Sequence, residues 1–162
     1  MSVYSIIGSK VEIGAAVAMK SADFVAADFT TPLTAATEVK EPKTLGSVTD
    51  EWGTTEFSNV TDGRTRTLKF FKKGKPVELT FGNDPLDAGQ LAVRAAALVD
   101  ANYAFRVSFG DKPTTGASPK PSTRLFIGTI LSVEDDPSGE HHILKVTIQP
   151  NSNIVATQAS PT

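Results

Sequence analysis

One segment of this chain, residues 83–103, has the pattern of an α-helix, whereas most apolar residues around it alternate as they do in β-strands. Asp84 is placed as an N-cap, Pro85 suits the first helical position, and Asp87 puts negative charge near the positive end of the helix dipole. These signals predict a helix over about residues 85–101. A chain with one helix among strands is restricted to a mainly β fold in which the helix covers a sheet.

The predicted helix has one stripe of apolar and small residues: Ala88, Leu91, Ala92, Ala95, Leu98 and Val99. Small side chains on this stripe favour a close approach to a sheet. We expect Leu91, Ala95 and Leu98 to form the packing face of the helix, and Arg94 to point away from it.

Segments with apolar residues at every second position predict strands at 11–19, 66–71, 76–82, 103–109, 124–134 and 141–149. Two hairpins are expected among them. One has the basic turn KKGK between residues 66–71 and 76–82, and the other has DDPSG before residues 141–149. The predicted fold class is therefore a small antiparallel β-sandwich or barrel-like domain with one flanking helix.

The strand at residues 124–134 is apolar on both of its faces. Leu125 and Ile127 share one face, on which Leu131 and Val133 are also expected, and Phe126 and Ile130 share the other. Something must cover the second face, either the helix or a neighbouring subunit, because exposed aliphatic patches usually mark a contact. Phe126 and Ile130 are therefore candidates for a subunit contact.

In the other segments, apolar residues recur at no regular spacing. Residues 21–36 predict an irregular excursion anchored by Phe24 and Phe29, and residues 37–46 resemble a charged strand. Residues 47–63 predict a long polar loop and residues 112–123 an exposed flexible one. The chain is expected to form one domain over residues 1–150, with a C-terminal extension at 151–162.

Composition excludes several functional classes. A length of 162 residues suits one domain, and a net charge of −2 argues against a surface that grips nucleic-acid phosphates. The chain has no cysteine, which excludes disulfides and thiolate metal sites. The N-terminal sequence has neither a basic region nor a long apolar run, so we expect no signal peptide and no contact with a membrane.

The residues with catalytic or metal-binding potential do not form a convincing site. His141 and His142 are adjacent on a predicted strand and would point to opposite faces, which makes joint metal ligation poor. The segment EDDPSGE lacks the ligand spacing of a calcium loop, and the pair Asp50–Glu51 has no partner nearby for acid–base chemistry. The sequence predicts a protein that is not an enzyme and that has no cofactor or metal.

The order of several segments resembles the tail tube protein, or major tail protein, of long-tailed, lambda-like siphovirus bacteriophages. These segments are EVKEPKTLGSVTDEWG, VTDGRTRTLKFFKKGK, LTFGNDPLDAGQLAVRAA, YAFRVSFGD and RLFIGTILSVE. The resemblance covers roughly residues 20–150, and its most specific part is the helix start NDPLDAGQ with YAFRVSFGD directly behind the helix. The appended immunoglobulin-like domain of some relatives is not expected.

The resemblance implies a structural virion protein that forms hexameric rings, which stack into the tail tube through which DNA is ejected. Its implied partners are other copies of itself, the tape measure protein in the lumen, the tail initiator and terminator proteins, and double-stranded DNA in non-specific passage. The implied location is the virion tail, after assembly in the host cytoplasm. Ring closure would also use the edge strands of a small sheet.

The resemblance further suggests that the loop at residues 47–63 reaches into the adjacent ring. Its aromatic residues Trp52 and Phe57 would anchor that contact, and Asp50 and Glu51 lie beside them in the chain. The alternative is that each aromatic residue folds back on its own domain. A neutral or acidic lumen would let DNA slide. The acidic residues expected to face it are Glu38, Glu41 and Glu78, besides the pair Asp50–Glu51, and solvated exterior positions are the alternative for all of them.

A different class has the same composition. A non-enzymatic β-sandwich that binds a ligand or decorates a capsid would also lack catalytic motifs, although one Trp and two Tyr offer little material for a carbohydrate site. A hydrolase with an unrecognised acidic pair is the third alternative. Rings or tubes of the purified protein would separate the first class from these two.

Overall fold

The structure is a computed structural model that describes residues 3–162. Its strands are β1 (Lys10–Ala16), β2 (Thr37–Val39), β3 (Pro42–Thr44), β4 (Asp50–Asn59), β5 (Arg64–Gly74), β6 (Val77–Gly82), β7 (Tyr103–Ser108), β8 (Thr123–Asp136), β9 (Ile143–Pro150) and β10 (Val155–Thr157). The helices are α1 (Ala88–Ala97) and the short 3₁₀ helix η1 (Ala26–Phe29). The predicted mainly β fold with a single α-helix is confirmed for the described residues.

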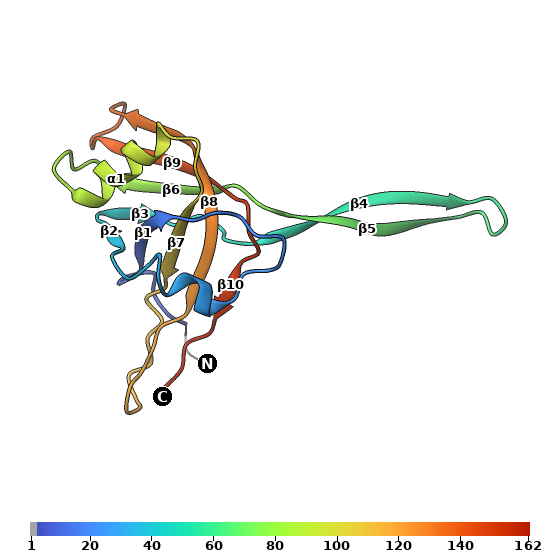
Figure 1. The fold of residues 1–162 in the computed structure, drawn as a ribbon, viewed down its shortest axis with the longest axis horizontal. Coiled ribbons are helices and arrows are strands. Elements are labelled where there is room, and N and C mark those ends of the chain that lie inside the picture. The colour runs from blue at the N-terminus through green and yellow to red at the C-terminus, as the bar shows by residue number, and fades with distance from the viewer. Residues whose placement is uncertain (1–2) are drawn as a thin grey trace.

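The body of the molecule is one antiparallel sheet with the strand order β2-β1-β7-β8-β9-β6-β3, and β10 pairs with β8 beside this path. The first and last strands in this order, β2 and β3, are separated in the chain by Lys40 and Glu41 alone. Two residues can span only about 10 Å between their flanking Cα atoms, so the two ends of the sheet must lie close together. The sheet therefore curls into a barrel-like layer (Figure 1).

The two faces of β8 are buried in two different clusters. Phe126 and Ile130 belong to the larger core, where the Phe126 ring stacks on Phe105 with ring centres 5.4 Å apart. Leu125 and Ile127 lie in a second cluster, which Phe24, Phe29 and Leu33 close from outside. The predicted two-sided burial of this strand and the anchoring roles of Phe24 and Phe29 are confirmed.

The chain itself covers both faces of β8, which corrects the prediction that Phe126 and Ile130 contact another subunit. Val93 and Ala96 of α1 share the core with them, so the helix provides the cover. A register shift between Ile130 and Ser132 places an extra residue, Leu131, in a bulge. Leu131 is exposed as a result, and Val133 packs on the larger core instead of sharing a face with Leu125.

The predicted hairpin of residues 66–71 and 76–82 is wrong, and so is the long loop at residues 47–63. β5 pairs with β4, and β6 pairs with β9 and β3. Most of the predicted loop is thus a strand. By contrast, the predicted hairpin of β8 with β9 is confirmed. Residues after Pro150 pack on the body, where β10 pairs with β8 and the buried Ser152 hydroxyl accepts a hydrogen bond from the Ile127 amide at 2.8 Å.

Helix α1 begins three residues later than predicted and buries a different face. Asp87, rather than Asp84, is the N-cap, and its carboxylate accepts a hydrogen bond from the Gln90 amide at 2.9 Å. The buried residues of the helix are Gly89, Gln90, Val93 and Ala96. Leu91, Ala95 and Leu98 are all exposed, so the predicted packing face is wrong.

Gln90 accounts for the wrong prediction of the packing face. Its polar side chain is buried, and its hydrogen bonds make this burial possible. Its amide nitrogen donates to the Gly82 carbonyl at 2.7 Å and to the Lys40 carbonyl at 3.3 Å. Its amide oxygen accepts from the Asp84 amide at 3.0 Å. A buried polar group with satisfied hydrogen bonds is tolerated in a core, so the interior stripe of this helix is not its most apolar one.

Arg94 fastens the outer side of α1 to β8. Its guanidinium donates two hydrogen bonds to the Asp135 carboxylate, at 2.9 and 2.6 Å. These bonds are the main reason that the pKa of Asp135 lies below its usual value near 3.8. The helix is therefore held on one side by apolar packing and on the other by this ion pair.

The ion pair predicts a pH-dependent contribution to stability. A carboxylate with a lowered pKa in the folded state stabilises the fold above its unfolded pKa, and this contribution is lost as the pH falls through the folded value. We expect Asp135→Asn to lower the melting temperature slightly at pH 7, since the pair is partly exposed, and this deficit to shrink as the pH falls below about 4. Thermal melts from pH 7 to 2 test this, with Glu140→Gln as the control. A deficit that is as large at the lowest pH as at pH 7 would contradict it.

Candidate functional site: the projecting hairpin

Strands β4 and β5 form a separate two-stranded sheet that projects far from the body along the longest axis of the molecule (Figure 1). At about 3.3 Å per residue, ten paired residues extend for roughly 30 Å. Every residue of β5 except Gly74 is exposed. An isolated two-stranded hairpin is marginally stable in water, so this element is suited to gain its stability from a neighbour.

The turn of the hairpin lies at residues 60–63. The Asn59 side chain accepts a hydrogen bond from the Thr61 amide, and the Asp62 carboxylate accepts one from the Arg64 amide. Gly63 has a φ of 62°, a conformation that glycine adopts without strain. The dipeptide Asp62-Gly63 is a strong hairpin signal, and it would have predicted this turn from the sequence alone.

One face of the hairpin is aromatic and basic. Phe57 lies opposite Arg66, Thr55 opposite Leu68, and Asn59 opposite Arg64. Directly opposed residues share a face, as do residues two positions apart, so Phe70 continues the row of Leu68. The large side chains of this face are exposed: 57% for Phe57, 50% for Leu68 and 60% for Phe70. We call Phe57, Leu68, Phe70, Arg64 and Arg66 the aromatic face.

The opposite face is polar and is bounded by a tryptophan near the body. The hydroxyls of Ser58 and Thr65 are 3.1 Å apart across the strands. Trp52 is flanked by the ammonium groups of Lys69 and Lys72, which lie 5.7 and 5.9 Å from its ring centre. Trp52 is thus half covered by its own hairpin, and it does not belong to the aromatic face.

A bulge separates these two regions. Trp52 pairs with Lys72 and Thr54 with Lys69, so Gly53 alone lies opposite both Phe70 and Phe71. The two phenylalanine rings meet edge to face, with their centres 4.3 Å apart. A bulge bends a strand and increases its local twist, so it sets the direction in which the outer hairpin points.

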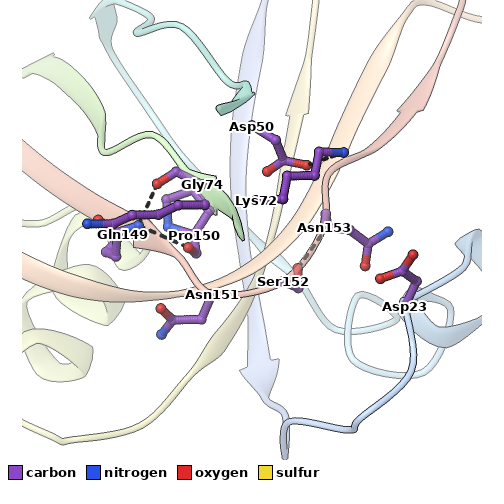
Figure 2. A pocket seen from close by; sticks show the side chains of 10 residues that line it. Asp23, Asp50, Lys72, Gly74, Gln149, Pro150, Asn151, Ser152 and Asn153 are labelled. Carbon is purple, nitrogen blue, oxygen red and sulfur yellow. Dashed lines mark hydrogen bonds and ion pairs between the residues drawn. The ribbon is translucent and has the colours of Figure 1, made fainter. Parts of the chain in front are cut away.

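The base of the hairpin is fixed to the body around a polar cavity of about 440 Å³. Figure 2 shows Asp50 and Lys72 of the hairpin near Asn153, which follows β9. Lys72 contacts the Asp50 carboxylate at 3.2 Å. Gln149 donates a hydrogen bond to the Gly74 carbonyl at 2.7 Å, and Asn153 both donates to and accepts from the backbone of Phe24.

These contacts indicate that the residues around the cavity fix the hairpin to the body. Its lining carboxylates are Asp23 and Asp50, and one of them is paired with Lys72. Among residues 3–162, no cluster of three or more His, Asp or Glu side chains is arranged to hold a metal ion. No helix in this part of the chain is long and apolar enough to cross a membrane.

The structure brings some of the predicted site residues together and separates others. Asp50, Glu51, Trp52 and Phe57 all lie on β4, with the first three near the body and Phe57 near the tip. Glu38 is on β2 and contacts Lys10 at 3.4 Å, Glu41 joins β2 to β3, and Glu78 lies exposed on β6. Leu68 and Phe70 were missed as surface residues because their pattern resembles a core strand.

Comparison with known proteins shows similarity in fold alone. No protein-family model matches the sequence, and no curated protein is significantly similar to it. The solved tail tube of SPP1 is 17% identical with a TM-score of 0.62, over 95% of this chain and 80% of that chain.

Chains from an extracellular contractile injection system and from the anti-feeding prophage are also similar in fold. One from the sheath/tube terminator of the contractile injection system PVC is 9% identical with a TM-score of 0.63, over 97% of this chain and 98% of that chain. One from the tube-terminating cap of the anti-feeding prophage is 12% identical with a TM-score of 0.61, over 98% and 94%. The resemblance that the sequence predicts is thus confirmed for the fold, and this chain has the tail-tube fold.

Proposed function

We propose that this chain is the structural subunit of a bacteriophage tail tube. In this proposal it forms hexameric rings, and the rings stack into a tube through which DNA is ejected. The observation that carries the proposal is the projecting hairpin with its exposed aromatic face, on a domain of the tail-tube fold. A surface of this kind is stable in water only when a partner covers it.

The hairpin gives the stacking contact of this proposal. Its length and its direction away from the body allow it to reach a copy in the adjacent ring (Figure 1). Phe57 is proposed as an anchor of that contact, together with Leu68 and Phe70. Trp52, Asp50 and Glu51 are proposed to support the hairpin near its base, since Asp50 pairs with Lys72 and Glu51 with Lys75.

Further partners belong to the same proposal. They are the tape measure protein in the lumen, the tail initiator and terminator proteins, and DNA in non-specific passage. Glu41 and Glu78 are proposed as lumen-facing acidic residues; Glu38 is a weaker candidate because Lys10 partly neutralises it. The proposed location is the virion tail, after assembly in the host cytoplasm.

Self-assembly tests the proposal directly. We expect the purified chain at high concentration, alone or with an initiator complex, to form rings of six subunits and tubes. Analytical ultracentrifugation and negative-stain electron microscopy detect both species. A strictly monomeric protein under all these conditions would contradict the tube function and favour a ligand-binding or capsid-decoration module.

A further inference from the structure

A second exposed apolar surface lies at the opposite end of the molecule from the hairpin. It consists of the outer side of α1 and the segments next to it, with Leu86 exposed to 88% and Leu98 to 89%. Leu91 and Val99 are half exposed between them. We call Leu86, Leu91, Leu98 and Val99, with the acidic residues of segments 83–100 and 134–142, the α1 patch. In Figure 1, α1 and the turn between β8 and β9 are at the left and the hairpin extends to the right.

The α1 patch is strongly acidic. Residues 83–100 and 134–142 contain seven acidic residues and a single basic one, Arg94. Arg94 pairs with Asp135, and Lys145 pairs with Asp136 at 2.7 Å. Three others, Asp84, Asp100 and Glu140, form no ion pair within residues 3–162, whereas Glu134 lies directly opposite Lys145 across β8 and β9. The surface therefore combines leucine side chains with uncompensated negative charge.

The hairpin has the complementary character. Residues 64–75 contain six basic residues and no acidic one. The whole segment 50–75 has six basic and four acidic residues, a net charge of +2, which leaves −4 for the rest of a chain with net charge −2. On the aromatic face, Arg64 and Arg66 lie beside Phe57 and Leu68; Arg66 also pairs with Asp62 at 2.7 Å, whereas Arg64 forms no ion pair within residues 3–162. One end of the molecule is thus apolar and basic, and the other is apolar and acidic.

We propose that the α1 patch is the docking site for the aromatic face of the hairpin of a second copy of this chain. This inference rests on the proposed function, and it names the surface that receives the hairpin. Burial of Phe57, Leu68 and Phe70 against the leucines provides the apolar contact. Arg64 and Arg66 face the unpaired carboxylates, and this charge complementarity selects the partner surface.

The positions of the two surfaces give the contact its direction. Each copy has its hairpin at one end and its α1 patch at the other, so the contact joins unlike surfaces of successive copies. A contact between unlike surfaces that does not close into a ring produces an extended filament. Two hairpins would repel each other by their like charges, and so would two α1 patches, which excludes pairing of equal ends.

Reciprocal charge reversal tests the docking site in the full chain. The first variant, Arg64→Glu with Arg66→Glu, reverses the hairpin and leaves the α1 patch intact. The second, Asp100→Lys with Glu140→Lys, reverses exposed, unpaired residues of the α1 patch and leaves the hairpin intact. We expect each variant alone to form rings but to lose at least about 90% of tube mass in a pelleting assay. An equimolar mixture should regain tubes, because each reversed surface then meets its reversed partner.

An uncharged test uses the leucines. Leu91→Ser with Leu98→Ser should also lose tubes, whereas Val25→Ser, a change of an exposed apolar residue beside η1, should assemble normally. Tube formation by the parent should weaken as salt is raised from about 0.05 to 0.5 M, since salt screens exposed charges.

The outcomes distinguish this inference from the proposed function. Absence of rings and tubes in the parent would overturn both. Normal tubes from the patch variants, or no recovery in the mixture, would overturn the docking site while the tube function stands. Patch variants that fold but cannot form even rings would show that the α1 patch contacts a neighbour within the ring, which also overturns the inference.

Discussion

Removal of the outer hairpin should abolish tube formation and leave the body folded. We expect this result when residues 53–71 are replaced by Asn-Gly, which closes a short turn directly beyond the pair Trp52–Lys72. None of the removed residues is part of either apolar cluster, so the free energy of unfolding should remain near that of the parent. Circular dichroism and thermal melting measure the fold, and electron microscopy measures the tubes.

Both strands must be removed together in this experiment. A deletion of residues 49–62 alone would remove β4 and leave β5 unpaired, with its phenylalanines exposed. A finer variant, Phe57→Ser with Phe70→Ser, should reproduce much of the loss. Its matched control is Thr54→Ser with Thr67→Ser on the polar face of the same hairpin. Normal tubes from the shortened chain would show that the hairpin has no role in stacking.

Val93→Asp should unfold the domain or nearly do so. Val93 is 2% exposed and packs in the larger core, where an unpaired carboxylate has no hydrogen-bond partner. Burial of such a group costs about 3 kcal/mol or more, against a total stability of about 5–15 kcal/mol for an ordinary domain. Denaturant unfolding should show a large loss, or no folded baseline at all.

The matched control is Leu98→Asp, five residues further along the chain. Leu98 is almost fully exposed, so this change should alter the free energy of unfolding by no more than about 0.5 kcal/mol. The helical stripe in the sequence predicts the opposite order, because it places Leu98 on the packing face. Equal effects of the two substitutions would show that both the stripe and the structure misplace the buried side of α1.

Patterns that repeat within one element were read correctly from the sequence. The alternation over Tyr103–Phe109 gave β7, and apolar residues on both faces gave the two-sided burial of β8. Each of these strands pairs over most of its length with neighbours in the sheet. Their buried faces are therefore set by local alternation, which a single sequence shows.

The features that the sequence did not predict depend on contacts between segments that are distant in the chain. Gln90 is buried because it meets carbonyls of Gly82 and Lys40, and no local pattern shows that these carbonyls are near. β5 has the composition of a core strand but pairs with β4 outside the body, since β9 occupies the place beside β6. The candidate site was therefore found in part: Trp52 and Phe57 were identified, whereas Leu68 and Phe70 were placed on a predicted strand but not recognised as part of the site.

The unpaired edges of the hairpin are much longer than the edge strands of the body. The end strands of the body, β2 and β3, have three residues each, whereas the unpaired edges of β4 and β5 are ten and eleven residues long. Amides in a thin exposed ribbon open to solvent at a much lower free energy than those of a packed body. Hydrogen exchange should thus be fast in the hairpin of the free subunit and slow in the tube, so that capture by a neighbour and ordering of the hairpin become one step.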